Sequence, residues 1–477
     1  MKDDIRVPKS LLVIGNGFDL SCGLRSNYLS FLTNILSSKI NSKELEVIEK
    51  IKQGLRNYIE KSEHFWNASP QQLIAIIGDN NRFILDLNIW YLLFVYKDMI
   101  HDINWYLIED QIASELLGDH NNLNIVEKIG DTLLGIYGGK VNYKGRKGRL
   151  YCRTKTNTYD EENLIDKIYE LFAYCLLHKN LGSLDRNNKA VFQELRDTVQ
   201  RLGDEYKELS SQNKINRSPY FETFEQKIIS VLFPLVAQAL LAELNELEGD
   251  FRNYLRECTF TSTSRITYTE NAESHFRQIL APVNVDRGYS DIVDFNILSF
   301  NYTTPWDNYT APWETPNNKI FEKVFDSINI HGKISNSDGI IFGIDDEKIA
   351  PTQNEFIFSK VSRTLDLITL SNHRKNFEEL LSTSIENVVF YGHSLSIADY
   401  GYFRMIFNKY VENPKVKFYF TFKVYEGTTE DKERKKIVKK ISELFGKYSI
   451  DKEKNTDIFQ NLIHNQRIEI IPLEMFI

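Results

Sequence analysis

Two polar side chains, the Asn301 amide and the His331 imidazole, directly follow apolar runs typical of buried strands. A neutral amide in that position can donate and accept hydrogen bonds without carrying charge. An imidazole at a strand end, here followed by Gly332, can act as a general base near neutral pH. Each also has a structural explanation, Asn301 as a turn residue bonded to its own backbone and His331 as a structural histidine. We predict that they are the two catalytic residues, because both follow strands of one sheet.

A glycine loop near the start of the chain has the pattern of a phosphate site. The apolar run 11–14 leads into GNGFD at residues 15–19, and a helix follows. Such a loop aims backbone N–H groups and a helix N-terminus at one point, which suits a phosphate group. The alternative is a tight turn from strand to helix. Asp19 either accepts hydrogen bonds from ribose hydroxyls or caps the helix.

The same loop argues against two common classes of nucleotide protein. A dinucleotide fingerprint requires a third glycine where Leu20 stands, and the chain has no GKS or GKT triplet. The sequence therefore favours neither a hydride-transfer dehydrogenase nor a P-loop ATPase.

A further loop, residues 392–395 with the sequence GHSL, follows the apolar run 387–391. It is explained either as a turn in which Ser394 caps the next helix or as a ligand-binding loop. A nucleophilic serine would need a second glycine where Ser396 stands, so serine catalysis is not expected. Asp399 contacts either a ribose or the helix N-terminus. We expect no metal, and the predicted binding residues are Gly15, Asn16, Gly17, Phe18, Asp19, Thr303, Gly332, Gly392, His393, Ser394 and Asp399.

The elements that position these residues are predicted to form a doubly wound, mostly parallel α/β sheet. Both ends of the chain alternate short β-branched or aromatic runs with helical patterns, as that architecture requires. The carboxyl ends of parallel strands meet at one edge of a sheet, and ligands bind there. The expected strands are 11–14, 297–300, 328–330, 340–344, 387–391, 416–422 and 467–471.

The middle of the chain has a different pattern, with apolar residues at helical spacing over long segments such as 44–60 and 191–209. We therefore expect a nucleotide-binding α/β domain formed by residues 1–35 and 285–477, interrupted by a large all-helical insertion over residues 36–284.

Composition limits the partners and the compartment. The chain has 58 basic and 66 acidic residues, a net charge of −8, so it has no overall attraction for nucleic acid or an anionic membrane. The scattered cysteines, Cys22, Cys152, Cys175 and Cys258, form no CxxC pair and indicate neither disulfides nor zinc. The longest apolar run, 228–242, is shorter than the ~20 residues of a membrane span. We expect a cytoplasmic protein.

One local exception to the acidic balance lies between Lys140 and Lys155, where seven basic residues occur without an acid and Tyr143 and Tyr151 lie among them. This stretch is either a nucleic-acid contact or a solvated loop.

The order of the motifs resembles the bacteriophage abortive infection AbiH family: GNGFD, then GL and Tyr28, SFNYT, NIHG, and YGHSL with Asp399. The same order also resembles the sirtuin-like NAD-binding fold. That second resemblance implies that Gly15, Asn16 and Gly17 hold phosphates, that Asn301 lies near the nicotinamide ribose, and that His331 is the base.

Three departures from sirtuins change the expected reaction. Sirtuins carry alanine where Asn16 stands, an acid where Thr303 stands, and a four-cysteine zinc module that this chain lacks. Removal of acyl groups from lysine is therefore not expected. Hydrolysis of NAD, an activity of several sirtuin-like defence domains, is compatible with the residues present.

The resemblance thus implies a phage-defence effector that hydrolyses NAD or a related nucleotide at the nicotinamide–ribose bond. The partners it implies are a nucleotide ligand, a phage-derived trigger and a second copy of the chain in a homo-oligomer. Two alternatives remain: a nucleotide-binding sensor without catalysis, and a toxin that acts on nucleic acid through residues 140–155.

Overall fold

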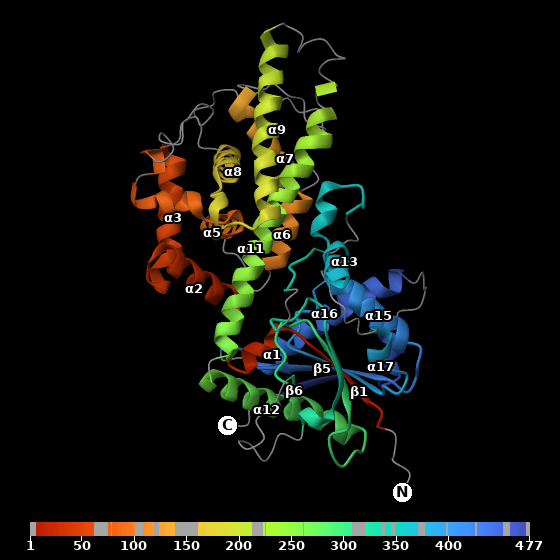
Figure 1. The fold of residues 1–477 in the computed structure, drawn as a ribbon. Helices are drawn as coiled ribbons and strands as arrows, with labels where there is room; N and C mark the ends of the chain where they lie inside the picture. The colour runs from red at the N-terminus through yellow and green to blue at the C-terminus, as the bar shows by residue number, and fades with distance from the viewer. Residues whose placement is uncertain are drawn as a thin grey trace. The chain divides into compact units, whose positions relative to one another are not determined.

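The chain folds into two compact units, shown as a ribbon in Figure 1. The first comprises residues 1–31, 249–345 and 363–477, and the second comprises residues 32–248 and 346–362. The computed structural model describes residues 6–61, 75–77, 79–100, 108–118, 124–138, 161–211, 223–224, 226–260, 262–307, 320–335, 339–344, 349–370, 377–396, 399–424, 427–451 and 458–473.

The first unit contains a six-stranded parallel sheet in the order β3-β2-β1-β4-β5-β6. The three central strands are buried at every residue, as expected for parallel strands covered on both faces. This confirms the predicted α/β class with a parallel sheet. The strands are β1 (Ser10–Ile14), β2 (Phe295–Ser299), β3 (Val324–Asn329), β4 (Asn387–Tyr391), β5 (Lys417–Lys423) and β6 (Ile468–Leu473).

Six of the seven expected strands correspond to these, and the seventh prediction is wrong. Residues 340–344 form isolated bridges and no strand of the sheet: Ile340 pairs antiparallel with Gly332, and Ile344 is also a bridge residue. Their apolar side chains are buried, yet the segment continues no ladder of the sheet. Burial alone therefore produced the strand-like pattern, which periodicity cannot distinguish from a true strand.

Helices cover both faces of the sheet. On one face, α12 (Ser262–Asp286) packs through Phe276 against Phe295 of β2, and Asp286 accepts a hydrogen bond from Tyr419 of β5. On the other face, β1 contributes Leu11 and Val13 to a core shared with four further helices. The remaining helices of this unit are α1 (Asn16–Ser21), η4 (Phe321–Lys323), α14 (Phe377–Leu380), α15 (Tyr400–Tyr410), α16 (Glu430–Asp451) and α17 (Ile458–His464).

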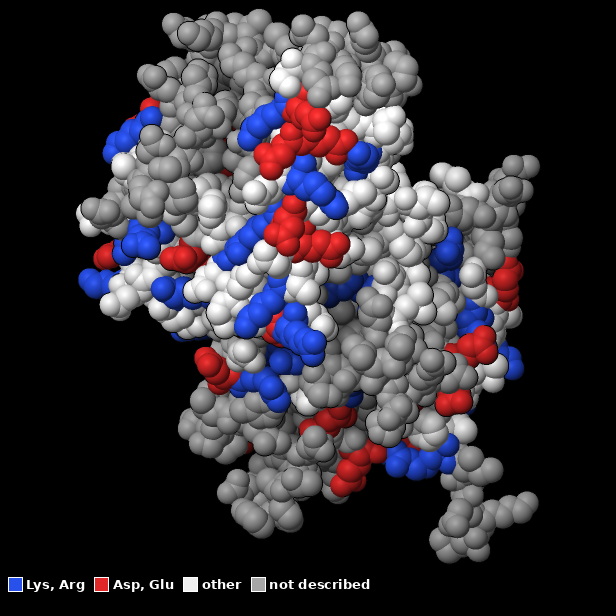
Figure 2. Space-filling model, turned by 45° about the horizontal axis from the view of Figure 1, so that its top comes forward, with Lys and Arg blue, Asp and Glu red and all other residues white. Residues whose placement is uncertain are grey.

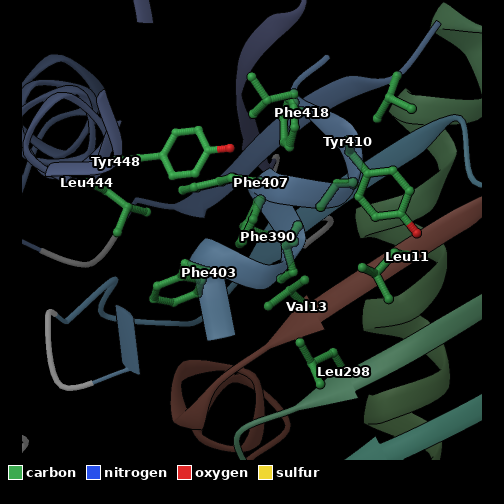
Figure 3. Close-up of a cluster of buried hydrophobic side chains, with 14 of the residues drawn as sticks. Leu11, Val13, Leu298, Phe390, Phe403, Phe407, Tyr410, Phe418, Leu444 and Tyr448 are labelled. Atoms are coloured by element: carbon green, nitrogen blue, oxygen red, sulfur yellow. The ribbon is translucent and has the colours of Figure 1, made fainter. Parts of the chain in front are cut away.

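The core between the sheet and these helices is rich in aromatic side chains (Figure 3). Phe407 of α15 stacks on Phe445 of α16 at 4.4 Å between ring centroids, and Phe390 of β4 stacks on Phe420 of β5 at 4.7 Å. Burial of each such side chain contributes about 1.5–3 kcal/mol. This packing fixes β4 and α15, the elements on either side of the 392–399 loop.

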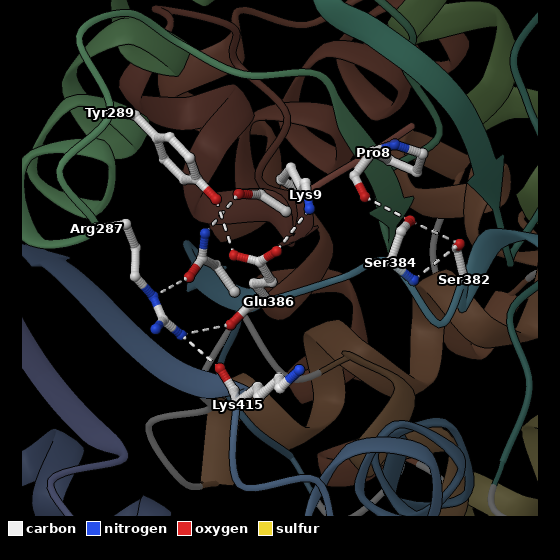
Figure 4. Close-up of polar contacts among 10 residues, drawn as sticks. Pro8, Lys9, Arg287, Tyr289, Ser382, Ser384, Glu386 and Lys415 are labelled. Carbon is white, nitrogen blue, oxygen red and sulfur yellow. Dashed lines mark hydrogen bonds and ion pairs between the residues drawn. The ribbon is translucent and has the colours of Figure 1, made fainter. Parts of the chain in front are cut away.

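The amino ends of the strands are held by a polar network (Figure 4). The Arg287 guanidinium donates to the Asn387 side chain and to the carbonyls of Glu386 and Lys415. The Glu386 carboxylate in turn pairs with Lys9 at 2.6 Å and accepts a hydrogen bond from Tyr289. The network joins the starts of β1, β4 and β5, so it stabilises the end of the sheet opposite the predicted site.

The second unit is helical throughout its described residues. Inside it, Trp90 donates its indole N–H to the carbonyl of Leu240, and Lys179 pairs with the buried Glu243 at 2.6 Å. Its helices are α3 (Glu44–Lys61), η1 (Asp79–Asp86), α5 (Ile89–Ile100), α6 (Ile108–Leu117), α7 (Ile125–Gly138), α8 (Glu161–His178), η2 (Leu181–Ser183), α9 (Arg186–Ser211), η3 (Ile228–Leu232, a π-helix) and η6 (Asn354–Phe358).

Three helices run across the boundaries between the units: α2 (Tyr28–Ile40), α11 (Phe233–Phe260) and α13 (Lys360–Leu370). The sheet unit therefore includes residues 249–284, which the sequence analysis assigned to the insertion. The physical reason is that the end of α11 and all of α12 pack on the sheet unit; Tyr254, for example, donates to the carbonyl of Arg25.

Among the described residues one helical segment, Ile228–Thr259, is long and apolar enough to cross a membrane by length and composition. Of its most apolar window, 61% is buried inside the protein. That burial is typical of a core helix in a soluble protein.

Candidate functional site

The loops that carry the predicted residues follow β1, β2, β3 and β4, four adjacent strands of the sheet. After β1 the chain builds β2 and β3 on one side, and it then returns to build β4, β5 and β6 on the other. The direction of winding therefore reverses between β1 and β4. In open parallel sheets such a reversal opens a crevice at the carboxyl ends of the strands.

At this reversal the glycine loops after β1 and β4 touch. The Gly15 N–H donates to the Tyr391 carbonyl at 3.2 Å, and the Gly17 N–H donates to the Gly392 carbonyl at 2.7 Å. Gly392 has φ +69°, and a Cβ there would lie 2.4 Å from the Phe18 nitrogen. The glycines thus permit the close approach of the two loops. A role for Gly15, Gly17 and Gly392 in binding phosphate stays a prediction. It requires the N–H groups of Gly15 and Gly17 to leave these carbonyls and donate to the phosphate instead.

Asn16 and Phe18 both make structural contacts. The Asn16 side chain donates to the Ser26 carbonyl and accepts from the Ser26 hydroxyl, which closes the turn after α1. Phe18 is buried and stacks on Phe276 of α12 with 4.8 Å between ring centroids. These contacts within the protein do not test whether Asn16 and Phe18 also bind a ligand, so that role stays a prediction.

Asp19 lies in a buried hydrogen-bonded cluster. Its Oδ1 accepts from the Tyr268 hydroxyl at 2.8 Å, and its Oδ2 accepts from the Thr303 hydroxyl at 2.7 Å. Burial raises the pKa of Asp19 to about 6, against the opposing effect of these hydrogen bonds. The carboxylate therefore joins α1 to α12 through Tyr268 and to the loop after β2 through Thr303, and it does not cap its own helix.

Asn301 is 3% exposed, and its backbone is held on both sides. Its N–H donates to the Ser299 hydroxyl, and its carbonyl accepts from the Asn329 amide at 2.7 Å. In contrast, the Nδ2 and Oδ1 atoms of its side chain form no hydrogen bond to the described residues. The amide nevertheless acts on the Asp19 carboxylate as a hydrogen-bond donor outside normal hydrogen-bond geometry, and it lowers the pKa of that carboxyl group.

The absence of partners for Asn301 argues for a bound polar group. A side chain that stabilised a turn would bond to nearby backbone, whereas this one makes no hydrogen bond of normal geometry to the described residues and interacts more weakly with the Asp19 carboxylate. Each buried polar atom without a partner costs about 1–3 kcal/mol. A ligand or water that supplied the missing hydrogen bonds would recover that free energy.

His331 and His393 both contact the carboxylate of Asp399. The Nε2 atom of His331 lies 3.5 Å from Oδ1, and the Nε2 atom of His393 lies 3.2 Å from Oδ2. The Phe300 ring packs against both imidazoles, with centroid distances of 5.8 Å to His331 and 4.2 Å to His393. Asp399 stands at the N-cap of α15 without capping it, so its carboxylate serves the histidines.

The two remaining predicted residues support these loops. Gly332 bridges to Ile340, and a Cβ on Gly332 would lie 2.4 Å from the Gly339 carbonyl oxygen. Ser394 is exposed, and its carbonyl accepts from Lys440 at 2.7 Å. The N-cap position of α15 is occupied by Asp399, not by Ser394.

The structure thus forms two clusters at one edge: Asp19 with Thr303, and His331 with His393 and Asp399. Tyr268 is a member of the first cluster that sequence reasoning missed. It comes from α12, far from the motifs in sequence, and no feature of the sequence around it marks it as a site residue. The described residues contain no group of three or more His, Cys, Asp or Glu placed to hold a metal ion.

Comparison with known proteins agrees with the motif order. No curated protein and no solved structure matches the chain. The family model described as Bacteriophage abortive infection AbiH matches residues 11–166 and 157–422, which include the loops after β1, β2, β3 and β4. The chain therefore belongs to the bacteriophage abortive infection AbiH family.

Proposed function

We propose that this protein is a phage-defence effector that hydrolyses NAD, or a related nucleotide, at the bond between nicotinamide and ribose. Membership of the AbiH family implies defence against phage by abortive infection. The observation that supports the reaction is the buried Asn301 amide, which lacks hydrogen-bond partners among the described residues at the carboxyl edge of the sheet.

The topology supports a nucleotide as the ligand. The strand order β3-β2-β1-β4-β5-β6 is the order of doubly wound dinucleotide-binding sheets, in which the ligand lies outside the carboxyl ends of the strands. Asn301 and His331 follow β2 and β3, which are adjacent strands, and the Tyr302 ring lies 6.4 Å from the His331 ring. A ribose held at this edge can contact both residues.

The reaction needs little acid catalysis, because the nicotinamide ring is already positively charged. The bond between ribose C1′ and the ring nitrogen breaks, both electrons go to the ring, and nicotinamide leaves as a neutral molecule. Positive charge then develops on the ribose, and attack by water at C1′ releases one proton. Enzymes accelerate such steps by holding the reactants and by placing negative or dipolar groups near the cation.

Each of three residues has a role in this scheme. Asn301 orients the ribose or the attacking water through its side-chain amide. His331 accepts the proton from water or from a ribose hydroxyl. With a pKa of about 6, Asp19 is mostly ionised at pH 7 and stabilises the positive charge on the ribose.

The site residues are buried in this state. Asp19, Asn301 and His331 are 2%, 3% and 4% exposed, so a substrate must displace some of their surroundings to reach them. An effector that stays inactive until infection needs such a closed state, and opening of a covering segment is a common way to control access.

The closed site also fits one alternative, a nucleotide-binding sensor without catalysis. The glycine N–H groups that would hold phosphates already donate to carbonyls, so binding requires a rearrangement that could itself be the signal. The nucleic-acid alternative gains no support from the face of the molecule in Figure 2. On the face in Figure 2, Lys and Arg side chains lie among Asp and Glu side chains, and residues 140–155 lie outside the described residues.

Release of nicotinamide distinguishes hydrolysis from sensing. The purified full-length protein is incubated with NAD, with and without extract of phage-infected cells, and nicotinamide is measured by chromatography. Hydrolysis predicts equal amounts of nicotinamide and ADP-ribose. A sensor predicts an increase in thermal stability with NAD and no product, since a ligand stabilises the state it binds.

A further inference from the structure

The Asp399 carboxylate lies between two buried histidines. The side chains of His331, His393 and Asp399 are 5%, 6% and 9% exposed. Each carboxylate oxygen faces a different Nε2 atom, Oδ1 that of His331 and Oδ2 that of His393. A carboxylate so deeply buried requires charged or hydrogen-bonding partners. His393 supplies a hydrogen bond to Oδ2, whereas Nε2 of His331 contacts Oδ1 at 3.5 Å without the geometry of a hydrogen bond.

The backbone determines which nitrogen of His393 carries the proton. The Leu395 N–H donates to Nδ1 of His393 at 2.8 Å, so this nitrogen holds a lone pair. In a neutral imidazole the proton is then on the other nitrogen, Nε2. That is the atom 3.2 Å from Asp399, so His393 donates a hydrogen bond to Oδ2.

The loop maintains this hydrogen bond at a conformational cost. Leu395 has φ +53°, a left-handed conformation that residues with a Cβ rarely adopt. Such conformations persist where surrounding contacts enforce them, and they are frequent at functional sites. Here the Lys440 ammonium donates to the carbonyl of Ser394, the residue before Leu395, at 2.7 Å. The loop after β1 also allows the close approach of His393, because a Cβ on Gly15 would lie 2.7 Å from the His393 Cα.

We infer that His393 and Asp399 are positioning residues in a His393–Asp399–His331 relay that orients the imidazole of His331. The relay directs the Nε2–H of His331 toward Asp399 and so leaves the lone pair of the neutral ring on Nδ1. His393 holds the other oxygen of Asp399 and keeps the carboxylate from rotating. The inferred orientation of His331 rests on the 3.5 Å contact between its Nε2 atom and Asp399, whereas the use of its Nδ1 as a base rests on the proposed function.

Histidine tautomers test the relay without any assay of activity. The chain has nine histidines, few enough to be resolved in long-range proton–nitrogen spectra of protein labelled at histidine. At pH 8 we expect the Nε2–H tautomer for both His331 and His393, each assigned by substitution. Asp399→Asn should convert His331 to a mixture of tautomers and leave His393 unchanged. The matched control is Asp431→Asn, an exposed carboxylate on α16.

A second pair of variants keeps the test decisive if Asp399→Asn does not fold. His393→Gln retains an N–H donor toward Asp399, and His393→Leu has none. We expect the Nε2–H tautomer of His331 in the Gln variant and a mixture in the Leu variant. The Nδ1–H tautomer for His393 in the wild type, or a His331 tautomer that is the same in all variants, would overturn the inference.

The kinetic consequence is measured separately. In NAD hydrolysis, His393→Leu should lower kcat by about 10- to 100-fold with little change in KM, as loss of a positioning partner typically does. His393→Gln should restore most of that loss, and the exposed His464→Gln should have no effect. If the wild type releases no nicotinamide, the proposed function fails and the tautomers still decide whether the relay exists.

Discussion

Asn296 in β2 and Asn301 in the loop after it are both buried asparagines, and they differ in the hydrogen bonds of their side chains. The Asn296 side chain donates to the Leu380 carbonyl at 2.7 Å, whereas neither polar atom of the Asn301 side chain bonds to a described residue. A buried amide that contributes no hydrogen bond to the fold weakens stability, and proteins tolerate this at sites that bind ligands.

This difference predicts opposite effects of the same substitution. Asn301→Leu removes two buried polar atoms without breaking a hydrogen bond, so the free energy of unfolding should stay within about 1 kcal/mol of the wild type or increase. Asn296→Leu leaves the Leu380 carbonyl without its donor and should lower the free energy of unfolding by about 1–3 kcal/mol. Urea denaturation of both variants measures this. A loss in Asn301→Leu as large as in Asn296→Leu would show that Asn301 is structural.

Asp19 gives a prediction for pH. Burial raises its pKa to about 6 in the folded protein, from an ordinary value of about 3.9. The folded state therefore binds this proton more tightly than the unfolded state, and its contribution to stability falls as pH rises from 4 to 6. The total change is about 3 kcal/mol.

Other carboxylates also change stability with pH; the pKa of Glu386, for example, is lowered. Comparison with the variant Asp19→Asn isolates the contribution of Asp19 from theirs. The difference in unfolding free energy, wild type minus variant, should decrease between pH 4 and pH 7 and be constant above it. Denaturation at four pH values in that range measures the difference. A difference that does not change with pH would contradict a raised pKa at Asp19.

The sequence predicted the residues that directly follow strands, and it could not predict those that other elements supply. Asn301 and His331 lie at one edge of the sheet because each ends a strand, which local patterns reveal. Tyr268 reaches Asp19 from α12, and the pairing of Asp399 with two histidines depends on how three loops pack. Such contacts between distant segments leave no local pattern in a single sequence.

At the scale of elements, the loops after β1 and β4 depend on glycine for their approach. A Cβ on Gly392 would lie 2.4 Å from the Phe18 nitrogen, a backbone atom that cannot move aside, and its φ of +69° is unfavourable for other residues. In contrast, a Cβ on Gly446 in α16 would meet nothing within 4 Å.

We therefore expect Gly392→Ala to lower the melting temperature markedly, through a loss of more than about 1–2 kcal/mol. Gly446→Ala should raise stability by about 0.5–1 kcal/mol, because alanine favours a helix more than glycine does. Thermal unfolding followed by circular dichroism compares the two. Equal melting temperatures for both variants would mean that the two loops do not touch as described.

The strands could be predicted because parallel strands that are buried on both faces appear in the sequence as short apolar runs. For β4 the predicted first and last residues are those of the structure. The same reasoning failed for residues 340–344, which are buried without joining the sheet. It also assigned α12 to the insertion, because a helical pattern shows that a segment is amphipathic but not which surface it packs against.

At the scale of the whole molecule, the chain combines a parallel sheet unit with a helical unit, and its family implies defence against phage. The second unit comprises residues 32–248 and 346–362, and the helical insertion over residues 36–284 stays a prediction. The family match includes the loops at the carboxyl edge of the sheet.

The central claim is that Asn301 and His331 act on a nucleotide at this edge, and nicotinamide release by matched variants tests it most directly. Asn301→Ala and His331→Ala are compared with Asn461→Ala and His464→Ala, two exposed residues of α17. We predict that the first pair releases nicotinamide from NAD at least about 100-fold more slowly than the wild type, with a melting temperature close to it for Asn301→Ala, and that the second pair is unaffected. Undiminished release by Asn301→Ala and His331→Ala, or no release by the wild type under any activating condition, would contradict the claim.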